Sequence, residues 1–191
     1  MQRTLICIPI VHTEEDMGSL GPSVHVDAGH RRLKQTRWAQ IHQQVQALAL
    51  DWPKVKVYQD GLPNTAAEIL NKILAEVPGP NYDLLRWLVG KGAELVGTES
   101  PVLVKEEYQY LQAVLTATNA EARAVARHAY AERASTLLAE RDAYIARRIA
   151  ETLPPNGVGL VFIGLSHRLA DHLPADIDTM ELESLTTAAP Q

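Results

Sequence analysis

The stretch TLICIPIV at residues 4–11 decides the fold of this chain. It is a continuous apolar run rich in β-branched side chains, which is typical of a strand buried on both faces of a parallel sheet. A second apolar run, VGLVFI at residues 158–163, has the same character. Shorter strands are predicted at residues 55–58, 94–98 and 177–180.

Helical patterns fill the segments between these strands. Apolar residues recur there at spacings of three and four, and capping signals at Thr65 and Thr118 precede two of the segments. The predicted helices cover residues 31–50, 65–77, 81–90, 102–115 and 118–153. Strands that alternate with helices predict an α/β fold, with a mostly parallel sheet of four or five strands flanked by helices. The length favours a single domain over residues 1–191.

The composition excludes several classes of protein. Apolar residues make up 46% of the 191 and charged residues 21%, which is typical of a globular domain and not of a disordered chain. The net charge of −5 argues against a general binder of nucleic acid. No run approaches the roughly 20 apolar residues of a membrane span. No secretory segment is recognisable either, so we expect a protein of the cytoplasm that does not bind a membrane.

Titratable residues follow the predicted strands at the points where these end. His12 follows the first strand, Asp60 the second, Glu99 the third and His167 the fourth. The carboxyl ends of parallel strands meet at one edge of a sheet, where ligands bind in open α/β folds. Two histidines with one or two carboxylates form a ligand set suited to Zn²⁺, Mn²⁺, Co²⁺ or Fe²⁺. The alternative is that these are ordinary polar loop residues.

Arg141 interrupts the apolar stripe of the longest predicted helix. It follows Leu138 by three positions and precedes Ile145 by four. An arginine on an apolar face is seldom buried without an anionic partner. We expect it either to anchor a strand-end carboxylate or to bind an anionic substrate, unless it pairs locally with Asp142 or Glu140 or extends to solvent.

Four short motifs in order resemble those of a known family. They are His12 after the first strand, LVGTES at residues 95–100, ERD at residues 140–142 and the G-x-x-H motif GLSH at residues 164–167. Together they resemble the TraB/PrgY/GumN family, which includes the Tiki metalloproteases, within the wider superfamily of erythromycin esterase and ChaN-like proteins. One departure is that Pro9 stands where the family's first G-x-x-H motif has its glycine.

The resemblance implies an α/β fold like that of erythromycin esterase and ChaN, and a site at the strand ends. It implies that His12, Glu99 and His167 are metal-binding or catalytic residues and that Arg141 is a site arginine. For the Tiki branch it implies metal-dependent hydrolysis of a peptide bond, and for the ChaN-like relatives it implies haem binding.

Our first hypothesis is therefore a metal-dependent hydrolase of a peptide or small-molecule substrate. The expected metal ligands are His12, Glu99 and His167. Arg141 would stabilise developing negative charge, and Asp60 or one of Glu14 and Glu15 would act as the general base. An open coordination position would let the metal activate water.

The second hypothesis is a binding module without catalysis on the same fold, for haem, a peptide or a small anion. Two further features stay open at this point. His25, Asp27 and His30 form a ligand-like group in a glycine-rich loop, but nothing in the sequence fixes their geometry. The alanine-rich helices offer a surface for a homodimer.

Overall fold

A five-stranded parallel sheet forms the centre of the molecule, in a computed structural model that describes residues 2–12 and 28–182. The strands lie in the order β3-β2-β4-β1-β5, and all the pairs are parallel. Their bounds are Arg3–Ile10 (β1), Val55–Pro63 (β2), Glu94–Glu99 (β3), Val158–Gly164 (β4) and Ile177–Glu181 (β5). The predicted α/β fold class is confirmed, and β1 and β4 are the buried inner strands that the two apolar runs predict.

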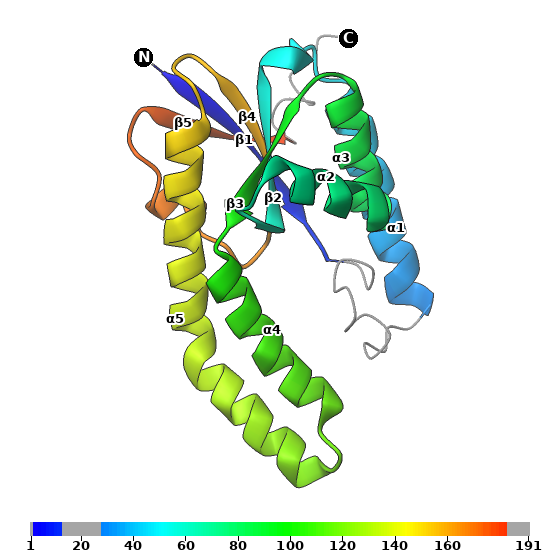
Figure 1. Ribbon diagram of the computed structural model, residues 1–191. Coiled ribbons are helices and arrows are strands. Elements are labelled where there is room, and N and C mark those ends of the chain that lie inside the picture. The colour runs from blue at the N-terminus through cyan, green and yellow to red at the C-terminus, as the bar shows by residue number, and fades with distance from the viewer. Residues whose placement is uncertain (1, 13–27, 183–191) are drawn as a thin grey trace.

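Helices cover both faces of the sheet (Figure 1). Three of them pack on one face, namely α1 (Ala28–Gln46), α2 (Ala67–Glu76) and α3 (Pro80–Gly90). The other face is covered by the second half of α5 (Ala120–Thr152), through Ile145 and Ile149. Two short 3₁₀ helices, η2 (Trp52–Lys54) and η3 (Leu169–Asp171), complete the described elements. None of the helices in the described ranges is long and apolar enough to cross a membrane.

Several bounds differ from the sequence prediction: the helix predicted over residues 31–50 is α1 at Ala28–Gln46, and the starts of α2 and α5 and the end of β2 also differ. Asn119, and not Thr118, caps α5, because its side chain accepts the Ala122 N–H at 2.8 Å. Thr65 lies one residue outside the N-cap position of α2 and does not cap it. Strand β2 continues past Tyr58 to Pro63, and this added part is irregular: Gly61 adopts a φ of +79° and the register with β3 shifts between Gln59 and Pro63.

The hairpin of α4 (Pro101–Thr116) and α5 projects beyond the carboxyl ends of the strands (Figure 1). The first half of α5 packs on α4 and not on the sheet, and the buried residues of α5 begin only at Leu137. Tyr110 stacks on Tyr130 in this hairpin, with ring centroids 5.8 Å apart. The hairpin therefore places side chains of both helices over the edge of the sheet where the strands end.

The strand register brings the predicted site residues together. Ile10 of β1 pairs with Gly164 of β4, so the residues that follow the two strands lie side by side. Gln59 of β2 pairs with Phe162 of β4, which places Asp60 next to the same end of β4. Glu99 is the last residue of β3 and pairs with Pro63 across the register shift.

We predict that Gly97 cannot carry a side chain. A Cβ at this position would collide with the backbone of Pro63 and Asn64, which is held by pairing with β3. We expect Gly97→Ala to lower the free energy of unfolding by roughly 3 kcal/mol in urea denaturation. Gly90→Ala is the matched control, because a Cβ there meets nothing within 4 Å, and it should stay within about 1 kcal/mol of wild type. If Gly97→Ala and Gly90→Ala lowered the free energy of unfolding equally, this account of the close approach at Gly97 would be contradicted.

Candidate functional site

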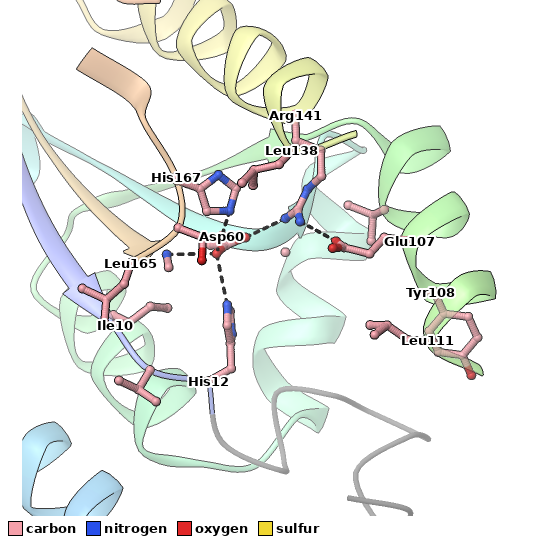
Figure 2. Close-up of a pocket in the computed structure, with 15 residues that line it drawn as sticks. Ile10, His12, Asp60, Glu107, Tyr108, Leu111, Leu138, Arg141, Leu165 and His167 are labelled. Carbon is pink, nitrogen blue, oxygen red and sulfur yellow. Dashed lines mark hydrogen bonds and ion pairs between the residues drawn. The ribbon is translucent and has the colours of Figure 1, made fainter. Parts of the chain in front are cut away.

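Asp60 is the centre of a polar cluster at the carboxyl ends of the strands (Figure 2). Its Oδ2 accepts the Gly164 N–H at 3.0 Å and lies 3.1 Å from Nε2 of His12 and 3.3 Å from Nε2 of His167. Its Oδ1 accepts a hydrogen bond of 2.7 Å from Nη2 of Arg141. Two imidazoles, one amide and one guanidinium thus converge on a carboxylate that is only 7% exposed.

Arg141 connects three carboxylates from three different elements. Its Nε and Nη2 donate to both oxygens of Glu99, its Nη2 also donates to Asp60, and its Nη1 donates to Glu107 of α4. Four of the five guanidinium N–H groups are thus bound to carboxylates within the protein. Of the alternatives that the sequence left open, these contacts match the anchor for strand-end carboxylates. They do not match a local pair with Asp142 or Glu140.

Asp142 binds Nδ1 of His167, the ring nitrogen that does not face Asp60. Its Oδ1 lies 2.5 Å from Nδ1 of His167, and its Oδ2 accepts the backbone N–H of Arg168 at 2.9 Å. A carboxylate only accepts hydrogen bonds, so Nδ1 carries a proton and Nε2 is the atom that faces Asp60. Sequence reasoning missed this role and named Asp142 only as a local partner for Arg141. The sequence carries no signal for it, because an acidic residue within a helix is ordinarily solvated.

Burial and charge shift the pKa values of the cluster in opposite directions. Burial alone would raise the pKa of Asp60, but hydrogen bonds from His12 and His167 more than offset it and hold that pKa well below its usual value. Burial opposes the charged form of His167, yet Asp142 and Asp60 raise its pKa to about 9. Burial raises the pKa of Glu99, because it outweighs the attraction of Arg141. The two carboxylates beside His167 therefore favour its charged form.

Acidic groups outnumber permanent cations around this cluster. In the described residues, the carboxyl groups of Asp60, Glu99 and Glu107 bind the guanidinium of Arg141, and Asp142 binds His167. In the part of the chain that the structure describes, the imidazoles of His12 and His167 also contact Asp60. An excess of buried acidic groups with imidazoles among them favours a bound cation.

A cavity of about 480 Å³ opens on this cluster. His12, Asp60, Arg141 and His167 form its polar end. Its apolar walls come from α4, α5 and the loop after β4, and they include Val104, Tyr108, Leu111, Leu138 and Leu165. The volume is within the range of sites for small molecules.

The structure brings together most of the residues that the sequence predicts. His12, Asp60, Glu99, Arg141 and His167 belong to one cluster, and one potential ligand atom each of Asp60, Glu99 and His167 lies within 4.8 Å of the others. The geometry differs from expectation in one respect: Asp60 is the carboxylate next to both imidazoles, whereas both oxygens of Glu99 accept from Arg141.

Several predicted residues cannot be placed in the site. Glu14, His25 and Asp27 lie outside the described residues. His30 belongs to the first turn of α1, at the beginning of the second described range. Glu107 was missed by sequence reasoning, because it belongs to the middle of a helix and carries no strand-end signal.

The comparisons with known proteins found no relatives. No family model matches the chain, and neither a curated protein nor a solved structure matches it. The site is therefore interpreted from its own geometry.

We predict that Arg141 and Glu99 stabilise the fold as a unit. Arg141→Met leaves Asp60 and Glu99 buried without their cation, and we expect it to lower the free energy of unfolding by about 3–5 kcal/mol. In the double variant Arg141→Met, Glu99→Leu the cost should be at least about 1 kcal/mol less than the sum of the two single changes. Urea denaturation followed by circular dichroism measures all three.

Arg133 supplies the control for this cycle. From α5 it also bridges two glutamates, but the side chains of Glu106 and Glu140 are 32% and 45% exposed, whereas that of Glu99 is fully buried. We expect Arg133→Met to have a much smaller effect than Arg141→Met, because exposed ion pairs contribute little to stability. Equal losses for the two arginines, or strict additivity of Arg141→Met and Glu99→Leu, would contradict the assignment of a buried ion-pair unit.

Proposed function

We propose that this protein is a metal-dependent hydrolase of peptide or ester bonds. One observation carries the proposal: His12 and His167 direct Nε2 at the same oxygen of Asp60, while Asp142 holds the other ring nitrogen of His167. Histidines that bind metals commonly donate their second N–H to a carboxylate in this way, which fixes the ring and its tautomer.

The donor set fits a divalent transition metal. Two imidazole nitrogens and a carboxylate oxygen suit Mn²⁺, Co²⁺, Zn²⁺ or Fe²⁺. Two ligand atoms at about 2.1 Å from one ion are themselves separated by roughly 3.0–3.4 Å. The 3.1 Å and 3.3 Å from Asp60 Oδ2 to the two Nε2 atoms fall in this interval. Potential ligand atoms of Asp60, Glu99 and His167 lie within 4.8 Å of one another, and His12 adds a nitrogen 3.1 Å from Asp60 Oδ2. We assign Asp60, His167 and His12 as the ligands, with Glu99 beside them in its pair with Arg141.

The remaining residues position these ligands. Arg141, fixed by Glu99, donates to Oδ1 of Asp60 and leaves Oδ2 directed at the imidazoles. The Gly164 N–H donates to the same Oδ2 and so fixes this oxygen at the end of β4. The metal, when bound, supplies Lewis acidity that activates water and polarises the scissile carbonyl. Since four N–H groups of Arg141 are bound to carboxylates, its role in this scheme is to position Asp60.

Metal titration tests the proposal directly. Protein stripped of metal should bind one Mn²⁺, Co²⁺ or Zn²⁺ with a sub-micromolar Kd in calorimetry. His12→Ala, Asp60→Asn and His167→Ala should each weaken binding by about 100-fold or more, because each removes one of three ligands. His128→Ala is the matched control, since this histidine is exposed on α5 and pairs with Glu132.

The same proteins connect the metal to activity. Wild type should hydrolyse members of a peptide and ester panel only with added Mn²⁺, Co²⁺ or Zn²⁺, and the three ligand variants should lose this activity. A wild type that binds no metal, or ligand variants that bind it as tightly as wild type, would end the proposal.

Asp142 provides an independent test of the histidine geometry. Asp142→Asn keeps the size of the side chain but removes the charge that holds Nδ1 of His167. We expect metal affinity to fall by about 10–100-fold with the fold intact. Glu140→Gln, two positions earlier on the same helix, alters only a surface pair with Arg133 and should leave the affinity unchanged. Unchanged affinity in Asp142→Asn would contradict this support for His167.

A second candidate function is ligand binding without catalysis. The observation that favours it is that both ring nitrogens of His167 pair with carboxylates of the protein itself, Asp60 and Asp142. The acidic groups around the cavity disfavour haem propionates and small anions more than they disfavour a peptide or a neutral ligand. A wild type without metal affinity that develops a Soret band with haem, lost in His12→Ala, would support the haem version. Binding of peptides alone would support the peptide version.

A further inference from the structure

The cavity has a second end that the metal chemistry does not use. Its polar end contains the proposed ligands, whereas Tyr108 and Leu111 of α4 and Leu138 of α5 form an apolar wall beside them. None of these three side chains belongs to either of the two cores, and each is partly exposed to solvent. In Figure 2, Tyr108 and Leu111 face the cluster from the side opposite Ile10 and Leu165.

Leu165 gives an independent indication of what this wall binds. It stands between Gly164 and the proposed ligand His167, lines the cavity and is 74% exposed. When a ligand covers a large aliphatic side chain that is otherwise in water, the burial of its apolar surface favours binding. The cavity therefore presents apolar surface on both sides of its polar cluster.

The charges of the cluster limit the ligand further. Asp60, Glu99 and Glu107 share one guanidinium, and Asp142 lies behind His167. In the protein without its metal, a negatively charged group at this cluster would be repelled by these carboxylates. A neutral group meets no such barrier, and the apolar wall favours an aliphatic or aromatic part.

We propose that the site takes neutral acyl compounds, esters or amides, whose aliphatic or aromatic acyl group packs against Tyr108, Leu111 and Leu138. The inference rests on the proposed function, which supplies the hydrolysis. In that reaction the acyl C–O or C–N bond breaks, the oxygen of water bonds to the acyl carbon, and the leaving group takes a proton from that water. The apolar wall selects the substrate by the size of its acyl group.

A hydroxamate series tests the acyl group in the metal-loaded protein. n-Alkyl hydroxamic acids combine a metal-binding head with an acyl chain, and their Kd is measured by calorimetry from the two-carbon to the eight-carbon compound. We expect wild type to bind about two- to fourfold more tightly for each added CH₂ until the wall is covered. Leu111→Gln and Leu138→Gln should flatten this dependence, while Val125→Gln, an exposed position of α5, should leave it as in wild type.

A second arm uses the metal-free protein, so that the two proposals can fail separately. The neutral dye Nile red is displaced by n-alkanamides and by n-alkanoates of equal chain length. We expect the amides to displace the dye at least about tenfold more effectively than the carboxylates, because the carboxylates meet the acidic cluster. Displacement should improve with chain length and be weakened by Leu111→Gln and Leu138→Gln.

The outcomes separate as follows. Tight metal binding with hydroxamate affinities that do not depend on chain length would overturn the acyl-group inference and leave the hydrolase proposal standing. Chain-length-dependent displacement by amides in a protein that binds no metal would support the acyl-group site and overturn the hydrolase proposal. Alkanoates that displace the dye as well as amides do, or leucine variants that behave as wild type, would overturn the inference.

Discussion

The buried guanidinium of Arg141 joins the parts of this molecule that form the site. It belongs to α5 and binds Asp60 of β2, Glu99 of β3 and Glu107 of α4. Its side chain and those of Asp60 and Glu99 are at most 8% exposed, so none of the three charges is well solvated by water. Removal of one partner leaves the others uncompensated in a medium of low polarisability, which is why the arrangement holds as a unit.

The position of Asp60 follows from this interaction. Arg141 occupies one carboxylate oxygen, and the other is left to the Gly164 N–H and the two imidazoles. Gly164 permits this approach, since a Cβ there would lie 3.0 Å from Oδ2 of Asp60. The glycine of the GLSH motif thus has a steric role that spacing in the sequence could not show. The cluster is held in place before any ion or substrate binds.

The sequence was sufficient to predict the sheet and the residues at its edge. Continuous apolar runs indicated the inner strands, and parallel strands must end at one edge, so His12, Asp60, Glu99 and His167 were found without coordinates. The division of roles between the carboxylates could not be predicted. It follows from the local backbone of β2, where Gly61 has a positive φ beside Asp60 and the register with β3 shifts between Gln59 and Pro63.

Glu107 and Asp142 were beyond sequence reasoning for a different reason. Both belong to helix interiors, where an acidic residue is ordinarily solvated and carries no positional signal. Their roles arise from how α4 crosses the sheet edge and how α5 is rotated about its axis. Such packing angles are set by many apolar contacts at once, and no short motif encodes them.

The triplet at residues 140–142 has a consequence for how α5 can sit on the sheet. Neighbouring helix residues are separated by about 100° and 1.5 Å, so Arg141 reaches β2 and β3 while Asp142 reaches the loop after β4. A slip of the helix by one position either way would present an acid, Glu140 or Asp142, to Asp60 and Glu99. Like charges in a dry interior forbid that arrangement. The alternation of charge along these three residues thereby fixes the position of α5 along its axis and its rotation against the sheet.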